Sequence, residues 1–228
     1  MSILIAVTAI AVGTLIGRLT AHHRLHHLQT ALRQAQQHAD HDRLTGMLNR
    51  WAAATLVART VETSRRPTTL ALIDLDNFKT INDAYGYQAG DQLLRIAAAR
   101  LTITALHHGG FTARLGGDEF LLVVPHTAGN PQTITTQALA ALAQTARLAT
   151  DDGPITVTPA GSAGLTTYDG TTPTTFTDLL HQADIALHHA KQHRGTHHTY
   201  QPGMSMPRNA GRHGPRRRDQ HRTGQTPA

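Results

Sequence analysis

The amino-acid sequence predicts an α+β domain, a mixed β-sheet flanked by helices, over residues 42–200. Stretches with helical and with extended apolar spacing alternate along this part of the chain. The apolar run 68–75 leads into a helical stretch, as in a strand followed by a crossover helix. A Gly-Gly turn at 116–117 separates two further apolar runs and predicts a β-hairpin. A crossover and a hairpin in one sheet give it both parallel and antiparallel neighbours.

Each element follows from a local pattern. Apolar residues at steps of three and four predict helices, and continuous or alternating apolar runs predict strands. The expected helices are 47–61, 90–105, 131–150 and 176–192. The expected strands are 68–75, 111–115, 120–124 and 155–163, with 196–200 as an edge strand.

The chain begins with an apolar segment, and residues 1–20 are expected to be a transmembrane anchor. No charged side chain precedes Arg18, and a helix of this length spans roughly 30 Å, one hydrocarbon thickness. A signal peptide and a buried or interfacial helix are the alternatives. Arg18, Arg24 and Arg33 follow the segment, so the positive-inside rule places the rest of the chain on the cytoplasmic side of the inner membrane.

A helical linker is expected at 21–41. Leu25, Leu28 and Leu32, followed by Ala35 and Ala39, alternate steps of three and four, which is the seam of a short coiled coil. A single amphipathic helix that connects the anchor to the domain is the alternative.

Composition excludes several classes of function and explains the charge. The chain has no Cys, so disulfides, thiolate nucleophiles and cysteine metal sites are excluded. Six arginines and one aspartate in residues 201–228 account for five of the six net positive charges. This segment lacks apolar periodicity, so we expect a disordered basic tail that is either solvated or in contact with anionic lipid. Nucleic-acid binding is disfavoured because no aromatic side chains are interleaved with these arginines.

Paired acids mark two places on the predicted sheet. Asp118 and Glu119 follow the Gly-Gly turn, where hairpins usually need only one Asn or Asp. The strand 68–75 runs into Asp74 and Asp76, which alternation along a strand sends to the same face, and Lys79 follows. Carboxylates that bind Mg²⁺, with an ammonium group for phosphate, are what a nucleoside triphosphate site requires.

Several motifs in order resemble the GGDEF domains of bacterial diguanylate cyclases. They are Asp-Arg-Leu-Thr-Gly-Met-Leu-Asn-Arg at 42–50, Asp-Leu-Asp-Asn-Phe-Lys-Thr-Ile-Asn-Asp at 74–83, Gly-Tyr-Gln-Ala-Gly-Asp at 86–91 and Arg-Leu-Gly-Gly-Asp-Glu-Phe at 114–120. Segments 162–164 and 183–191 are similar to later parts of the family. The resemblance implies a GGDEF fold and the joining of two GTP molecules into cyclic di-GMP with release of two pyrophosphates. It also implies a homodimer, because each subunit brings one GTP to a shared site.

The resemblance also implies roles for individual residues. Asp74, the carbonyl of Leu75, Asp118 and Glu119 match the ligands of Mg²⁺ or Mn²⁺, and Asp118 and Glu119 are the catalytic candidates. Positions that match substrate contacts are Lys79, Asn82, Asp91, Gly116, Gly117, Lys191 and Arg194. Lys79 and Lys191 are the only lysines of the chain, which favours a retained triphosphate site.

The chain departs from the family pattern at several places. Tyr87 stands where the family usually has His, and Arg194-Gly195 inverts the usual Gly-Arg order. These two changes motivate an alternative, a catalytically inactive GGDEF domain that binds GTP and acts as a regulatory or interaction module. His107 and Gly110 replace the Arg and Asp of the family's product-inhibition site, so we expect no product inhibition there.

Overall fold

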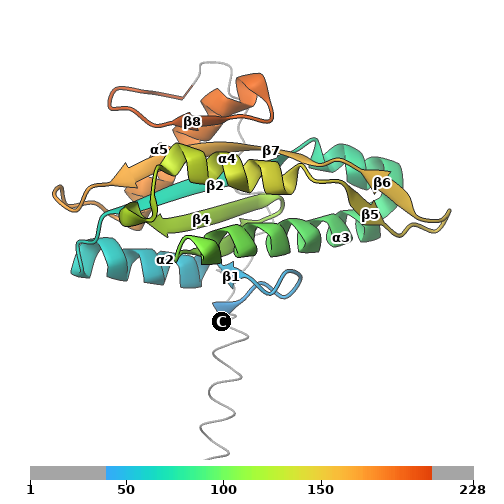
Figure 1. Ribbon diagram of the computed structural model, residues 1–228, viewed down its shortest axis with the longest axis horizontal. Helices are drawn as coiled ribbons and strands as arrows, with labels where there is room; N and C mark the ends of the chain where they lie inside the picture. Colours follow the sequence, from blue (N-terminus) through green and yellow to red (C-terminus); the bar gives the residue numbers. More distant parts are fainter. Residues whose placement is uncertain (1–39, 207–228) are drawn as a thin grey trace, which may run out of the picture.

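A computed structural model describes residues 40–206, so the predicted anchor, most of the linker and most of the basic tail lie outside the described residues. A mixed six-stranded sheet has the strand order β1-β3-β4-β2-β7-β8 and carries helices on both faces (Figure 1), which confirms the predicted fold class. Its strands are β1 (Leu48–Asn49), β2 (Thr68–Asp76), β3 (Phe111–Gly116), β4 (Glu119–Pro125), β7 (Ala160–Tyr168) and β8 (His197–Thr199). The helices are α2 (Arg50–Ala58), α3 (Phe78–His107), α4 (Pro131–Leu142) and α5 (Phe176–Ala190).

Short elements complete the fold. A two-stranded sheet, β5 (Ala146–Leu148) with β6 (Ile155–Val157), projects at one end of the molecule (Figure 1). A π-helical turn, Arg59–Thr63, extends α2, and 3₁₀ turns lie at His126–Ala128 and Lys191–His193. Among residues 40–206, no helix combines the length and apolarity that a bilayer crossing needs.

Strand β2 is the centre of the sheet because it pairs antiparallel with β4 on one side and with β7 on the other. All its residues from Thr68 to Leu75 are buried, as expected for a strand covered on both faces. In this register Asp74 lies opposite Glu119 on β4 and opposite Ser162 on β7. The sheet topology therefore gathers polar residues from three strands where β2 ends.

Two apolar cores flank the sheet. Helices α3 and α4 cover one face, where Leu93, Leu101 and Leu142 pack with Ile73 and Phe120. Helices α2 and α5 cover the other face, whose core includes Val57, Leu70, Leu121, Leu179 and Leu187. Because both faces are covered, the ends of the strands are the open parts of the sheet, and the polar residues lie at one of them.

Helix α3 is much longer than predicted. The sequence predicts a helix at 90–105, but α3 begins at Phe78 and contains a kink at Gly86, whose φ of 81° and ψ of 163° are not helical. The first part was missed because only Phe78, Ile81 and Asn82 are even half-buried before the kink, so its apolar periodicity is weak. The kink turns one apparent helix into two segments that face each other.

Two other predicted helices have different ends. The predicted helix 47–61 begins at Arg50, because Asn49 caps it by accepting a hydrogen bond from the Ala52 amide at 3.0 Å. The predicted helix 131–150 ends at Leu142, and β5 follows within the same range. Arg100 on α3 donates to the carbonyl oxygens of Leu142 at 3.0 Å and Thr145 at 2.9 Å. These hydrogen bonds satisfy carbonyl groups at the C-terminal end of α4 and hold the chain where it leaves the helix.

The predicted single strand 155–163 is wrong, because this stretch contains β6 of the small sheet and the start of β7 of the large sheet, with Pro159, which lacks a backbone N–H, between them. The elements α5 and β8 agree with their predictions apart from their ends. A capping box between Thr175 and Asp178 starts α5. Strand β8 pairs in parallel with β7 at the edge of the sheet, as expected. The described chain continues to residue 206, six residues beyond the predicted boundary, and His189 Nε2 lies 3.0 Å from the carbonyl oxygen of Ser205. The beginning of the predicted tail thus folds back on α5.

Candidate functional site

The four predicted metal-binding positions meet at the end of β2. Asp74 is buried and lies opposite Glu119 across the β2–β4 pair. The amide of Leu75 donates to the carbonyl oxygen of Asp118 at 3.3 Å, which joins the hairpin turn to β2. The structure therefore brings together the residues that the sequence predicted from two motifs more than 40 positions apart.

The turn that carries Asp118 and Glu119 depends on glycine. Gly116 has a φ of 147° and Gly117 a φ of 54°, both in the region that side chains with a Cβ rarely adopt. The pairing of β3 with β4 shifts register between Arg114 and Gly116, so the turn is irregular. This shape places two consecutive carboxylates beside the end of the central strand.

Arg114 holds this turn, a role that the sequence analysis did not assign. Its Nε and one terminal nitrogen donate to the carbonyl oxygen of Gly117 at 2.9 and 2.7 Å. Its other terminal nitrogen donates to both carboxylate oxygens of Asp42 at 3.0 and 3.2 Å. Asp42 also accepts hydrogen bonds from the amide and hydroxyl of Thr45 at 2.9 and 2.7 Å.

Arg50 supports the same turn from the other end of the 42–50 segment. Its Nε donates to the carbonyl oxygen of Leu115 at 3.3 Å, and its guanidinium lies 3.8 Å from the Glu119 carboxylate. Both arginines stand in segments that the sequence analysis recognised as motifs, Arg50 in 42–50 and Arg114 in 114–120. The contact between these segments, which spans 72 positions from Asp42 to Arg114, is visible only in the fold.

The carboxylates at this site disfavour one another's charge. Burial raises the pKa of Asp74 above its usual range, Lys191 opposes the shift, and Asp118 and Asp76 reinforce it. Burial also raises the pKa of Glu119. The charge of Asp74 adds to this rise, the Arg50 guanidinium counteracts it, and the charge of Asp118 adds to it further. An acidic cluster of this kind is stabilised by a cation.

Lys191 provides one such cation, since its Nζ lies 2.7 Å from an Asp74 carboxylate oxygen. The donor set of carboxylates and a backbone carbonyl also fits Mg²⁺ or Mn²⁺, because hard divalent cations prefer oxygen ligands. Within residues 40–206, no three acidic or histidine side chains are already arranged around a common metal position. The residues thus fit a divalent cation by chemistry and charge, with the Lys191 ammonium paired to Asp74 in this structure.

The positions predicted to read the base lie on either side of the α3 kink. Asn82 is on the first segment and Asp91 on the second. A Cβ atom at position 90 would overlap the Asn82 amide oxygen, so the two segments approach closely at Gly90. Lys79 is exposed at the start of α3, and Tyr87 is 82% exposed just after the kink.

The displaced Arg194 lies at the same end of β2. Its guanidinium donates to the side-chain oxygen of Asn77, the residue between β2 and α3. The following amide, that of Gly195, donates to Asp76 at 2.9 Å. The predicted site residues therefore lie on the end of β2, on the hairpin turn, on α3, or on the segment that follows α5.

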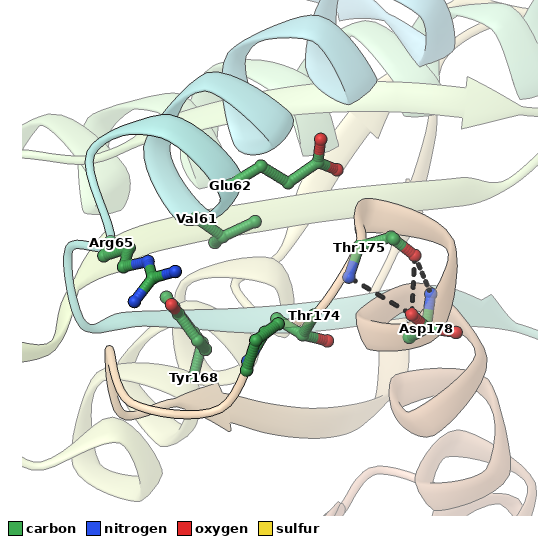
Figure 2. A pocket seen from close by; sticks show the side chains of 8 residues that line it. Val61, Glu62, Arg65, Tyr168, Thr174, Thr175 and Asp178 are labelled. Carbon is green, nitrogen blue, oxygen red and sulfur yellow. Dashed lines mark hydrogen bonds between the residues drawn. The ribbon is translucent and has the colours of Figure 1, made fainter.

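A separate pocket of about 290 Å³ lies at the opposite end of β2 (Figure 2). Tyr168 in its wall pairs with Thr68, six residues before Asp74, which is roughly 20 Å along a strand. Asp178, also in the wall, is engaged with Thr175 in the cap of α5. The pocket contains none of the predicted site residues; it is lined by Val61, Glu62, Arg65, Tyr168, Pro173, Thr174, Thr175 and Asp178.

The fold and the site together define an α+β domain whose acidic cluster, lysine and arginine converge at the end of a central strand. The sequence profile described as diguanylate cyclase, GGDEF domain matches residues 39–197, and the chain belongs to this family.

Known proteins share this domain in different contexts. Diguanylate cyclase DgcP of Pseudomonas aeruginosa is 33% identical over 164 residues, which are 71% of this chain and 24% of that protein. Cyclic di-GMP phosphodiesterase NbdA of the same organism is 32% identical over 171 residues, which are 74% of this chain and 21% of NbdA. The chain thus spans about a quarter of the length of these curated relatives.

A solved structure has the same fold. The coiled coil and GGDEF domain of DgcB from Caulobacter crescentus, in complex with c-di-GMP, superimposes with a TM-score of 0.70 at 25% identity. The match covers 81% of this chain and 98% of that one.

Proposed function

We propose that this chain is a diguanylate cyclase that condenses two GTP molecules into cyclic di-GMP and releases two pyrophosphates. The observation that carries the proposal is the convergence of Asp74, Asp118 and Glu119 with Lys191, whose Nζ is 2.7 Å from Asp74. Membership in the GGDEF family and the similarity to a protein named diguanylate cyclase support it.

The proposed roles follow from the chemistry of each group. Asn82 and Asp91 hydrogen-bond the guanine edge, and Lys79 and Lys191 meet the triphosphate as point charges. Asp74, the carbonyl of Leu75 and Asp118 would hold Mg²⁺, with Glu119 beside them. When bound, the metal neutralises phosphate charge and lowers the pKa of the 3′-hydroxyl. Asp118 is proposed to accept the proton from that hydroxyl.

The reaction joins two nucleotides, so we propose that two copies of the domain face each other. The 3′-oxygen of one GTP attacks the α-phosphorus of the other, pyrophosphate leaves, and the same step in the opposite direction closes the ring. Each domain orients one GTP, and holding the two reactants in line supplies much of the rate enhancement.

The test is incubation of the full chain with GTP and Mg²⁺, with product analysed by chromatography and mass. We expect cyclic di-GMP from the wild-type chain and at least about 100-fold less from Asp118→Asn, the size expected for removing a proton acceptor that also binds metal. Asp152→Asn is the matched control, because Asp152 lies in an exposed turn after β5 and should leave the rate unchanged.

The second candidate is a GTP-binding regulatory module without cyclase activity. Two observations favour it: the Arg194-Gly195 inversion, and a relative named as a phosphodiesterase that shares this domain. GTP binding without product, over a wide range of protein concentration, would select the module. Product that disappears in Asp118→Asn would select the cyclase.

We further propose that residues 1–20 anchor the protein in the inner membrane with the GGDEF domain in the cytoplasm. The uncharged apolar segment and the arginines after it support this placement. Recovery of the full chain in the membrane fraction after carbonate washing would support it, and recovery in the soluble fraction would refute it.

The basic tail is proposed to contact anionic lipid, so removing residues 207–228 should weaken binding to phosphatidylglycerol vesicles.

A further inference from the structure

The segment after α5 is fastened to the end of β2 by contacts that the roles proposed above do not use. Asp76 is the last residue of β2, and its two carboxylate oxygens share the single proton that Ser162 Oγ donates, each at 3.0 Å from that hydroxyl oxygen. One of them also accepts from the Gly195 amide at 2.9 Å. The same amide lies 3.3 Å from Ser162 Oγ. The Asp76 carboxylate from β2, the Ser162 hydroxyl from β7 and the Gly195 amide from the segment before β8 therefore contact one another.

This contact fixes the backbone beside the displaced arginine. Gly195 has a φ of 78°, which glycine adopts without strain, so its amide can turn toward Asp76. Arg194 comes immediately before that amide, and its guanidinium donates to the side-chain oxygen of Asn77. Asn77 lies two residues before Lys79, at the turn from which the predicted phosphate-binding lysine starts.

The arginine is held there by a neutral partner. An amide oxygen accepts a hydrogen bond from a guanidinium without cancelling its charge, and the planar guanidinium has further donors for a phosphate. Lys191, three residues earlier, is held differently, because it lies at the C-terminal end of α5 and pairs with Asp74. Lys191 thus contacts an acid of β2 directly, whereas Arg194 is followed by the amide that contacts the other acid, Asp76.

We propose that Asp76 is a positioning residue that acts through Ser162 and the Gly195 amide to hold Arg194 for contact with the phosphates of the substrate. The inference rests on the proposed GTP-binding function. It accounts for the inverted Arg194-Gly195 order, because the glycine supplies the amide that reaches Asp76 and the arginine before it reaches Asn77.

The first test is Asp76→Asn in the full chain. Asparagine has nearly the same volume, but it offers one acceptor oxygen and an NH₂ group to two donors, the Ser162 hydroxyl and the Gly195 amide. We expect GTP to bind about tenfold more weakly in equilibrium dialysis with Mg²⁺, the loss expected for one hydrogen bond to a charged group. The amides of residues 194–196 should also exchange hydrogen faster in the free protein.

The matched control is Asp169→Asn. Asp169 likewise accepts from a backbone amide and a hydroxyl, both from Thr171 at 2.8 Å, but it follows β7 at the opposite end of the sheet. GTP binding should be unchanged. Ser162→Ala removes the hydroxyl without altering charge and should weaken GTP binding in the same direction as Asp76→Asn, so it tests the proposal even if Asp76→Asn does not fold.

A double-mutant cycle separates positioning from general stability. In an Arg194→Ala background, Asp76→Asn should have no further effect on GTP binding, because the group that it positions is gone. In a Lys191→Met background its effect should persist. Undiminished weakening in the Arg194→Ala background, or wild-type GTP affinity in both Asp76→Asn and Ser162→Ala, overturns the inference. A wild-type chain that binds no GTP refutes the proposed function itself, and the inference with it.

Discussion

At the scale of single residues, the hairpin turn and the 42–50 segment form one unit. Arg114 joins the Gly117 carbonyl to the Asp42 carboxylate, and Arg50 joins the Leu115 carbonyl to Glu119. Both arginines direct fixed donors at oxygen atoms, a task for which a planar guanidinium is suited and a lysine is not. The turn that carries the carboxylates of the site is therefore tied to the 42–50 segment by two guanidinium groups.

We expect Asp42 to make the free energy of unfolding depend on pH in the acid range. Burial raises the pKa of Asp42, but the hydrogen bonds from Thr45 and Arg114 and the Arg114 charge outweigh burial and lower it. A carboxyl group whose pKa is lowered by folding stabilises the fold above its unfolded pKa of about 4, and that contribution is lost as the pH falls through the folded value. We therefore expect part of the acid destabilisation to disappear in Asp42→Asn.

The measurement is the free energy of unfolding by urea between pH 7 and pH 3. Asp42→Asn should be less stable than the wild-type chain at pH 7, with a smaller decline below about pH 4. Asp152→Asn in an exposed turn is the control and should follow the wild-type curve. Parallel curves for the wild-type chain and Asp42→Asn would contradict the prediction.

Gly110 is one of two reasons to expect no inhibition by the product, cyclic di-GMP. A Cβ atom at this position would overlap the backbone carbonyl of Val123, so the site cannot take an acid side chain without moving β4. With His107 in place of the family's arginine, we expect micromolar cyclic di-GMP to leave the initial rate unchanged. Inhibition that is lost in His107→Ala would show that product binds here after all.

At the scale of elements, the kink in α3 brings together the two positions that are proposed to read the base. An unbroken helix would place Asn82 and Asp91 nine residues, or roughly 14 Å, apart along one axis. The break at Gly86 folds the first segment back, so that Asn82 meets the backbone at Gly90. Glycine at 86 provides the backbone conformation, and glycine at 90 provides the close approach.

Gly90→Ala should therefore act on nucleotide binding through Asn82. The added methyl group would displace the Asn82 amide, and we expect the KM for GTP to rise about five- to tenfold with a smaller change in kcat. In an Asn82→Ala background the same substitution should have little further effect. Equal losses from Gly90→Ala in both backgrounds would point to a general disturbance of α3 instead.

At the scale of the whole molecule, the two ends of the sheet differ in chemistry. The end at Asp74 and Asp76 carries carboxylates, Lys191 and Arg194, whereas the other end has a pocket in which one of two carboxylates, that of Asp178, belongs to the cap of α5 (Figure 2). A single domain presents one copy of the acidic site. The proposed reaction of two nucleotides with each other therefore requires two such sites to face.

This requirement predicts how the rate depends on protein concentration. Below the dissociation constant of the dimer, doubling the concentration should raise the total rate about fourfold, and well above that constant about twofold. Initial rates over three decades of concentration test this, with Asp152→Asn as a control that should follow the same curve. A rate strictly proportional to concentration throughout would mean either a monomeric catalyst or a dimer too tight to dissociate, which sedimentation would distinguish.

The amino-acid sequence predicted the fold class, the central strand and the acidic residues and Lys191 that the structure brings together at the end of β2. It could do so because apolar periodicity and glycine turns are local signals, and because paired acids after a turn are unusual. The order of the motifs identified the family. Predictions for residues 1–39 and 207–228 concern segments outside the described structure, and they remain predictions.

Only the tertiary structure decided how these parts fit together. The first segment of α3 was missed because its exposed residues carry no periodicity, and the end of α4 was misplaced because Arg100, from another helix, satisfies its carbonyl groups. The contacts of Arg114 with Asp42, and of Asp76 with Gly195, join residues 72 and 119 positions apart. Such pairs have no local signature, because the free energy that favours them arises only when the sheet has brought the strand ends together.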